Sequence, residues 1–172
     1  MLRRILALIS AFILLGLGIA VILILVNTPT GKEKAVLAKI RAEENELARD
    51  FDVVVLRSGF QKRRSGERDI YVPALLVRVA NFSGTASKAV SLSAEFLRQG
   101  RIFCGAWGAV PELKPEESSE IWLKCIELTG FGSVAWGLTL AETTEAMDYQ
   151  VHLESKRASL LVIKGSLGSM LL

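Results

Sequence analysis

The hydrophobic positions near the start of the chain form one unbroken run, Ile5–Val26, which contains no charged residue. As a helix this run would extend about 33 Å, enough to cross a hydrocarbon core of about 30 Å. A cleaved signal peptide normally has a shorter apolar stretch followed by a small-x-small cleavage site, whereas this run ends at Val26-Asn27-Thr28-Pro29. We therefore predict an uncleaved signal anchor over residues 1–29, which contacts the lipid bilayer through residues 5–26.

The basic residues on the two sides of the anchor favour opposite orientations in the membrane. Arg3 and Arg4 adjoin its first end and would hold that end in the cytoplasm. Four basic residues follow the other end, set back from it and interleaved with glutamates: Lys32, Lys34, Lys39 and Arg41. Their number favours the reverse orientation, but their distance from the run and their acidic neighbours weaken them. We expect a single-pass protein with its domain on the extracytoplasmic side, either periplasmic or extracellular.

A helical pattern resumes after Pro29. Thr30-Gly31-Lys32-Glu33 fits the S/T-x-x-E capping box that begins many helices. A narrow apolar stripe then recurs at helical spacing. It consists of Val36, Ile40, Leu47 and Phe51. We predict a juxtamembrane amphipathic helix over 30–50 that docks this stripe against the next domain. A coiled coil between copies is the alternative, although fewer than two heptads are present.

From residue 51 onward the hydrophobic period changes to two, as in half-buried strands. Eight candidate strands follow: 52–57, 75–80, 90–97, 102–107, 121–128, 134–140, 149–153 and 159–163. Turn residues separate several of them, including Gln99-Gly100 and Lys114-Pro115. This spacing predicts a mainly β fold, an antiparallel Ig-like β-sandwich of seven or eight strands over 51–165, with a tail over 166–172. A closed barrel is the alternative. Pro73 cannot donate a ladder hydrogen bond, so we expect it at a strand start or edge.

Composition and charge exclude several classes of function. The length of 172 residues allows one ordinary domain. The formal net charge of +3 falls to +1 without Arg3 and Arg4, so the chain lacks the footprint of a nucleic-acid binder. Two cysteines and one histidine exclude a four-cysteine zinc site and most histidine-based metal or catalytic constellations within one chain.

No motif in the chain indicates catalysis. The sequence contains neither a G-x-S-x-G elbow nor a glycine-rich phosphate loop. His152 lies between Val151 and Leu153 on an alternating strand, so it should point away from their face toward solvent. We therefore predict a protein that is not an enzyme, with no catalytic, cofactor-binding or metal-binding residues and no cofactor.

Cys104 and Cys125 are candidates for a disulfide. If the segments flanking Lys114-Pro115 form one hairpin, these cysteines are equidistant from the turn and face each other across adjacent strands. Trp107 and Trp122 would face each other in the same way. The bridge is expected if the domain lies outside the cytoplasm, and two buried thiols are the alternative.

Further features point to contact surfaces rather than to chemistry. A concentrated basic segment lies between the first two predicted strands. It contains Lys62, Arg63, Arg64 and Arg68. This segment is able to contact anionic head groups or an acidic partner, and a solvated loop is the alternative. Asn81-Phe82-Ser83 matches a glycosylation sequon, which matters only in a eukaryotic secretory compartment. The three tryptophans, Trp107, Trp122 and Trp136, fit core or sheet-face packing better than a ligand platform.

One pattern resembles a known group of domains. Leu75-x-Val77-x-Val79-x-Asn81-x-Ser83 leads into Val90-x-Leu92-x-Ala94-x-Phe96, and then into Leu113-x-Pro115-x-Glu117. Over about residues 70–128 this resembles the membrane-anchored Ig-like or fibronectin-like accessory domains of bacterial envelopes, including the group named for a Phe-x-Leu-Tyr-Asp motif. The chain departs from that motif, because Phe96-Leu97-Arg98-Gln99 lacks the Tyr-Asp pair. The resemblance implies a non-enzymatic module that supports an assembly or binds a partner, and it carries over no functional residues.

These observations together predict the function in general terms. We expect a membrane-anchored β-sandwich that serves as a protein-interaction or assembly module of a membrane or cell-envelope complex. Its partner would be another protein or a second copy of the chain, and no nucleic acid is expected. The alternative is a membrane-tethered binding domain for a lipid, a glycan or another small ligand.

Overall fold

The structure is a computed structural model that describes residues 31–125, 137–168 and Leu172. The predicted anchor over residues 1–29 lies outside these residues. Among those described, no helix is long and apolar enough to span a membrane. The chain divides into two compact units, Met1–Lys39 and Ile40–Leu172, and the second contains the β domain.

Helix α2 (Gly31–Asp50) leads directly into the β domain, in agreement with the helix predicted over 30–50. The described strands are β1 (Phe51–Ser65), β2 (Arg68–Asn81), β3 (Val90–Arg98), β4 (Arg101–Val110), β5 (Ser118–Lys124), β6 (Met147–Glu154) and β7 (Ser159–Leu167). A short 3₁₀ helix, η1 (Glu142–Thr144), precedes β6. The prediction of a mainly β fold is therefore confirmed.

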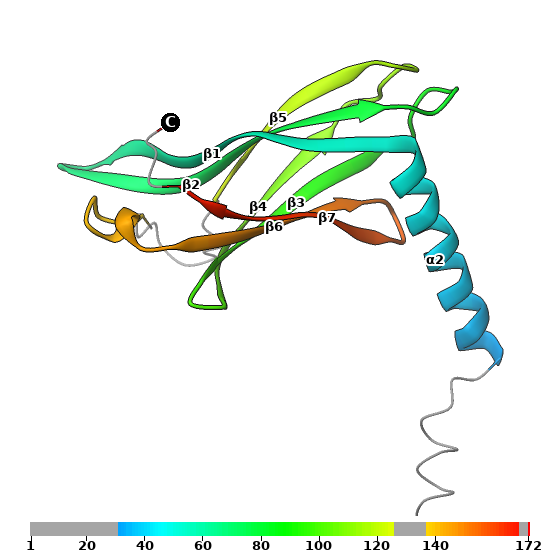
Figure 1. Ribbon diagram of the computed structural model, residues 1–172, viewed down its shortest axis with the longest axis horizontal. Coiled ribbons are helices and arrows are strands. Elements are labelled where there is room, and N and C mark those ends of the chain that lie inside the picture. Colours follow the sequence, from blue (N-terminus) through cyan, green and yellow to red (C-terminus); the bar gives the residue numbers. More distant parts are fainter. Residues whose placement is uncertain (1–30, 126–136, 169–171) are drawn as a thin grey trace, which may run out of the picture. The chain divides into compact units, whose positions relative to one another are not determined.

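The strands form two antiparallel sheets, with strand orders β1-β2-β5 and β4-β3-β6-β7. Figure 1 shows the sheets as two layers. Alternate side chains of both sheets point inward and form one core, as expected for sheets packed face to face. Its largest fully buried members include Phe60, Leu75, Leu92, Phe96, Leu123 and Leu153.

Two tight turns contain residues with positive φ. Gly66 (φ 60°) lies at the first central position of the β1–β2 hairpin, where a two-residue turn of type II′ requires glycine. Gln99 (φ 53°) and Gly100 (φ 74°) connect β3 to β4, and positive φ at both positions is the signature of a type I′ turn. The turn predicted at Gln99-Gly100 is confirmed.

The strand predicted over 134–140 is wrong for its described part. Residues 134–136 lie outside the described residues, and Leu138 forms only an isolated bridge with Tyr71. The reason is a local cap, because the N–H and hydroxyl of Thr139 donate to the Glu142 carboxylate (2.8 and 2.9 Å) and the chain turns into η1. These hydrogen bonds also lower the pKa of Glu142.

The boundary predicted between domain and tail at residue 165 is also wrong. Strand β7 continues to Leu167, and Gly165 pairs with Tyr149 on β6. A Cβ at Gly165 would lie 2.5 Å from the Tyr149 hydroxyl, so only glycine leaves room for that ring. The backbone N–H of Leu172 donates to the carbonyl of Phe60 (2.9 Å). Ser166, Leu167 and Leu172 of the predicted tail therefore belong to the sandwich.

The residues of α2 that belong to the second unit contact the sandwich through the predicted stripe. Leu47 is 5% exposed and belongs to the core, and Ile40 and Phe51 are half-buried against it. Val36 falls in the first unit. The helical spacing of these residues thus identified the docked face within the second unit.

Two glycines of β4 provide a matched test of how closely the sheets approach. A Cβ at Gly108 would lie 2.7 Å from Ile121 Cγ2 on β5, whereas one at Gly105 would meet only the Ala94 carbonyl, at 3.7 Å. We expect Gly108→Val to lower the free energy of unfolding by about 2 kcal/mol through overpacking. Gly105→Val should change it by less than about 0.5 kcal/mol. Urea denaturation followed by tryptophan fluorescence measures both, and equal losses would contradict the close contact at Gly108.

Candidate functional site

Polar contacts reinforce the attachment of α2 to the sandwich. The hydroxyl of Ser155 donates to Glu43 Oε1 (2.5 Å), and Lys88 Nζ pairs with Glu46 Oε1 (2.6 Å). The backbone N–H of Phe82 donates to the carbonyl of Asp50 (2.7 Å). The hydrogen bond to Glu46 raises the pKa of Lys88. We call these contacts, together with buried Leu47, the helix junction.

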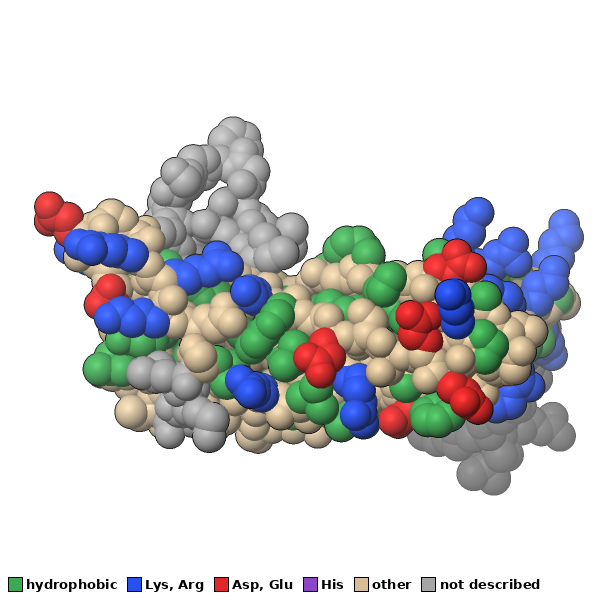
Figure 2. Space-filling model, turned by 90° about the horizontal axis from the view of Figure 1, so that it is seen from above, with side chains coloured by type: hydrophobic (Ala, Val, Ile, Leu, Met, Phe, Trp, Pro, Cys, Tyr) green, Lys and Arg blue, Asp and Glu red, His purple; other side chains and the backbone are tan. Residues whose placement is uncertain are grey.

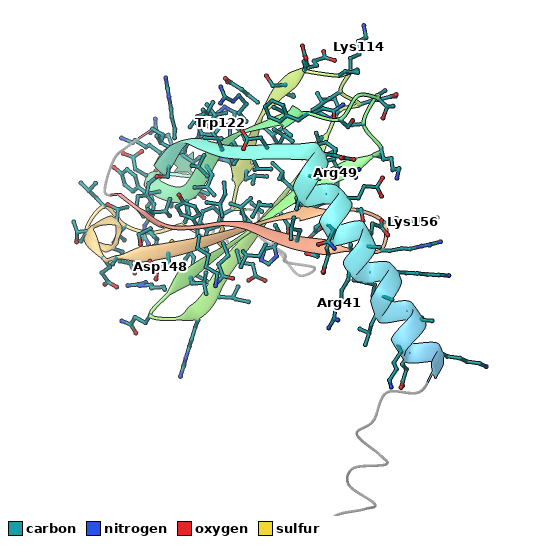
Figure 3. All side chains as sticks on the ribbon, turned by 45° about the vertical axis from the view of Figure 1, so that its right-hand side comes forward. Arg41, Arg49, Lys114, Trp122, Asp148 and Lys156 are labelled. Carbon is teal, nitrogen blue, oxygen red and sulfur yellow. A yellow bond between two sulfur atoms is a disulfide. The ribbon has the colours of Figure 1, made fainter. Side chains whose placement is uncertain are left out.

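Figure 3 shows the same arrangement from the side of the helix, with Arg41 and Arg49 along α2 and Lys156 in the turn beside it. A recess of about 70 Å³ lies at the junction, between the helix and the segment 83–88. The recess has room for about two water molecules. It is much smaller than the sites that bind small molecules, which usually measure about 300–1,000 Å³. The recess fits a structural joint better than a ligand site.

Asn81 organises the loops next to the helix junction. Its side chain is fully buried, and Nδ2 donates to the carbonyls of Thr85 (2.8 Å), Leu113 (3.0 Å) and Lys114 (3.2 Å). Its Oδ1 accepts from the N–H (3.0 Å) and hydroxyl (2.7 Å) of Ser83. The folded structure does not present Asn81 for glycosylation, because the amide that would carry a glycan is buried and bonded. The sequence pattern singled out Asn81 but did not indicate that it organises these loops.

The alternative interpretation of the basic segment was a solvated loop, but the structure places the segment in two strands. Lys62, Arg63 and Arg64 lie on β1 and Arg68 begins β2, so all four belong to the arms of one hairpin, here called the basic hairpin. The hairpin forms because Gly66 permits a tight turn and lets both strands continue to it. The structure thus brings these four residues together, as their sequence positions suggested.

The charges of the basic hairpin differ in their partners. Lys62 Nζ pairs with Asp69 Oδ2 (2.6 Å), and the hydrogen bond raises the pKa of Lys62. Arg63, Arg64 and Arg68 are exposed and form no ion pair with any residue that the structure describes. Figure 2 shows basic and acidic side chains close together at the end of this hairpin. The hairpin therefore offers three unpaired guanidinium groups for contact with an anionic partner.

Cys104 and Cys125 are bonded to each other, with their Cα atoms 5.9 Å apart. The hairpin register used to align them is nevertheless wrong. Cys104 lies on β4 in the four-stranded sheet, whereas Cys125 follows β5 of the three-stranded sheet. The segment 111–117 crosses between the sheets, so the disulfide joins two layers rather than two paired strands.

The same crossing separates the tryptophans. Trp107 pairs with Ser93 on the outer face of the four-stranded sheet, and Trp122 pairs with Leu76 on the outer face of the three-stranded sheet. Lys124 Nζ lies 5.3 Å from the centre of the Trp122 ring. The two rings therefore cannot line one groove. Trp136 lies outside the described residues.

His152 lies on the outer face of the four-stranded sheet, between Ser93 of β3 and Leu161 of β7. The expected outward direction is correct, but its exposure to solvent is not. The side chain is half-buried, and Nε2 is covered without a hydrogen-bond partner among the described residues. The same residues contain no group of three or more histidine, cysteine or acidic side chains arranged to hold a metal ion.

A second, wide depression of about 440 Å³ lies at the β3–β4 turn, beside Arg101 and Ile102. On its border, Arg98 bonds to Glu145 (2.6 Å) and lies 3.5 Å from Glu142. The sequence analysis did not single out this region. The uncharged stretch of β4 that begins there was visible in the sequence, but its position at a sheet edge was not.

Comparisons with known proteins do not assign a family. The sequence matches no protein-family description and no curated protein. One similar solved structure is a target of the Northeast Structural Genomics Consortium, with a TM-score of 0.42 and 15% identity over 70% of this chain and 88% of that one. A protein of Bordetella pertussis named as ApaA has a TM-score of 0.39 and 18% identity, over 69% and 92% of the two chains. Chicken MD-1 complexed with lipid IVa has a TM-score of 0.32 and 9% identity, over 70% and 90%.

Proposed function

We propose that this chain is a single-pass, membrane-anchored β-sandwich that acts as an interaction or assembly module on the extracytoplasmic side of a membrane. The observation that carries the proposal is the helix junction. Helix α2 begins right after the predicted anchor, and its second half is fixed to the sandwich by buried Leu47 and by the contacts of Glu43 and Glu46. Such a joint suits a domain that is displayed at a membrane.

The Ig-like or fibronectin-like character belongs to the same proposal. Seven strands in two antiparallel sheets are typical of these domains. In a constant-type immunoglobulin domain the fourth strand joins the first sheet, whereas here β4 lies beside β3 in the second sheet. The hallmark disulfide of antibody domains is also replaced by one between β4 and the end of β5. The resemblance to the group named for the Phe-x-Leu-Tyr-Asp motif remains a proposal.

The anchor is tested first by extraction. Ile5–Val26 contains no charge, so we expect the full chain to stay in membranes washed with alkaline carbonate. A variant with arginine at Leu14 and Leu15, in the middle of the run, should be released, because charges at the bilayer centre disfavour insertion. Immunoblots of pellet and supernatant measure both. Release of the unmodified chain would remove the membrane from the proposed function.

The interaction role is tested at the basic hairpin. A photo-crosslinking residue at Arg63 or Arg64 should give a discrete adduct in native membranes, identified by mass spectrometry. The same residue at Ser159, exposed at the start of β7, provides the control position. Added protein without the crosslinking residue should compete for the partner and lower the yield of this adduct. The same competitor with serine in place of the three unpaired arginines should no longer compete. If neither hairpin position gives an adduct beyond the Ser159 control, the hairpin is not a contact surface.

A further inference from the structure

The strand register divides the basic hairpin into two faces. Directly opposed residues of an antiparallel pair point to the same face, and successive residues of a strand alternate between faces. Ser65 lies directly opposite Arg68. Arg63 lies two residues before Ser65 on β1, so it points to the same face, here called the arginine face. Diagonal neighbours such as Arg63 and Arg68 have Cβ atoms about 7 Å apart, which lets two long side chains meet at one group.

The charges of the opposite face are balanced, whereas those of the arginine face are not. On the opposite face Asp69 lies directly across from Arg64 and pairs with Lys62 (2.6 Å). The two arginines of the arginine face have no acidic residue on the strands beside them. Glu67 lies in the turn and forms no ion pair with any described residue. Like charges on neighbouring strands repel each other, so a bound anion would stabilise the arginine face.

The arginine face is a set of hydrogen-bond donors whose spacing is fixed by the hairpin. Both guanidinium groups are exposed and form no ion pair with any residue that the structure describes. The half-buried Ser65 adds a hydroxyl donor directly opposite Arg68. The paired register continues up to the tight turn at Gly66, so binding does not have to order the backbone.

The number of donors favours a phosphate group over a carboxylate. One bidentate guanidinium already engages both oxygens of a carboxylate. A phosphate monoester has three acceptor oxygens and a charge of about −1.5 to −2 at pH 7, so it can bond to two guanidinium groups and a hydroxyl together. None of the large hydrophobic residues exposed in the described part of the chain lies in the hairpin, so nothing there suits insertion into a bilayer. Binding would therefore depend on the anionic group itself.

We propose that the arginine face binds a phosphate monoester group. The guanidinium groups of Arg63 and Arg68 contact it from two sides, and the Ser65 hydroxyl donates to a further oxygen. The inference rests on the proposed function only in taking the basic hairpin as a contact surface, and it names the chemistry that this surface recognises. A lipid head group and a soluble phosphorylated molecule present the same group, and they are separated by experiment.

Titration of the full chain in a neutral detergent with inorganic phosphate tests the site. In a chain labelled with ¹⁵N-arginine, the side-chain Nε signals of Arg63 and Arg68 should shift and saturate at millimolar phosphate. The loss of one signal in each of Arg63→Gln and Arg68→Gln assigns them. Acetate at the same ionic strength should require about tenfold higher concentration for an equal shift, because a carboxylate engages one guanidinium rather than two.

Matched variants on the two faces separate a site from a general positive field. Arg63→Gln and Arg68→Gln should each weaken phosphate binding by about fivefold, measured on the remaining arginine signal. Arg64→Gln removes the same charge from the opposite face and should weaken binding by less than about twofold. All three side chains are exposed, so the melting temperatures should agree. Equal losses from the three variants would overturn the inference.

Nanodiscs identify the source of the phosphate. If a lipid head group is the source, the signals of Arg63 and Arg68 should already be shifted in discs that contain phosphatidic acid, and added inorganic phosphate should change them little. If a soluble molecule is the source, the same signals should shift only when inorganic phosphate is added. Discs of phosphatidylcholine alone are the control for both measurements.

The possible results separate this inference from the proposed function. The absence of a saturable shift with phosphate overturns the inference, and so does an equal response to acetate. In either case membrane retention and adducts from the basic hairpin can persist, so the interaction role would stand with a partner of different chemistry. Loss of those two results, with phosphate binding intact, would overturn the proposed function instead.

Discussion

Replacement of Asn81 with alanine is expected to lower the free energy of unfolding by about 3–4 kcal/mol. The buried side chain makes three donor bonds to the carbonyls of Thr85, Leu113 and Lys114, and it accepts two from Ser83. Alanine would remove all of these hydrogen bonds, each of which contributes about 0.5–1.5 kcal/mol, while each of the three carbonyls keeps one other donor. The loss should be large because these bonds hold two loops at once.

Urea denaturation of the full chain in detergent, followed by tryptophan fluorescence, measures this effect. Ser83→Ala is the matched control, because it removes only the hydroxyl that donates to Asn81 Oδ1 and to the Thr85 carbonyl. It should lower the free energy by about 1 kcal/mol. Equal effects of the two variants would show that Asn81 does not organise the loops.

Opening the disulfide between Cys104 and Cys125 is expected to lower the free energy of unfolding by about 3 kcal/mol. The bridge spans a sequence separation of 21 residues, and closing a loop of that length restricts the unfolded chain by about this amount. It also fastens β4 to the end of β5, at the edges of two different sheets. Reduction should therefore loosen β4 before the rest of the sandwich.

The measurement compares urea denaturation with and without dithiothreitol. A variant with serine at both Cys104 and Cys125 should resemble the reduced protein, and dithiothreitol should not change it further. Hydrogen exchange should show the largest loss of protection in β4. If reduction leaves the stability unchanged, the bridge contributes nothing to the stability of the fold. In that case the oxidised protein and the double-serine variant should also unfold at the same urea concentration.

Local patterns were sufficient to predict several elements. The stripe of Ile40, Leu47 and Phe51 identified the docked side of α2, because helical spacing places such residues on one face. The alternation around Leu92 and Phe96 identified β3, because successive side chains of a strand point to opposite faces. Gln99-Gly100 predicted a turn through the positive φ that Gly100 tolerates.

Other features depended on contacts between distant segments. Pro73 was expected at a strand start or edge, yet it lies inside β2, the central strand of its sheet. The N–H of Cys125 donates to the Pro73 carbonyl just beyond the last residue of β5, so the ladder ends where proline lacks a donor. Strand β1 extends beyond the predicted 52–57, because its polar residues near the turn face solvent on both sides and show no hydrophobic alternation.

By itself the sequence determined the hydrophobic run, the helix that follows it, most of the strands and the pair of cysteines suited to a bridge. These features depend on spacing along the chain, where backbone geometry fixes which side chains share a face. Only the tertiary structure decided which strands share a sheet, that the disulfide joins two layers and that Asn81 is buried. Sheet membership depends on pairing between segments far apart in the chain, and local periodicity does not encode that choice.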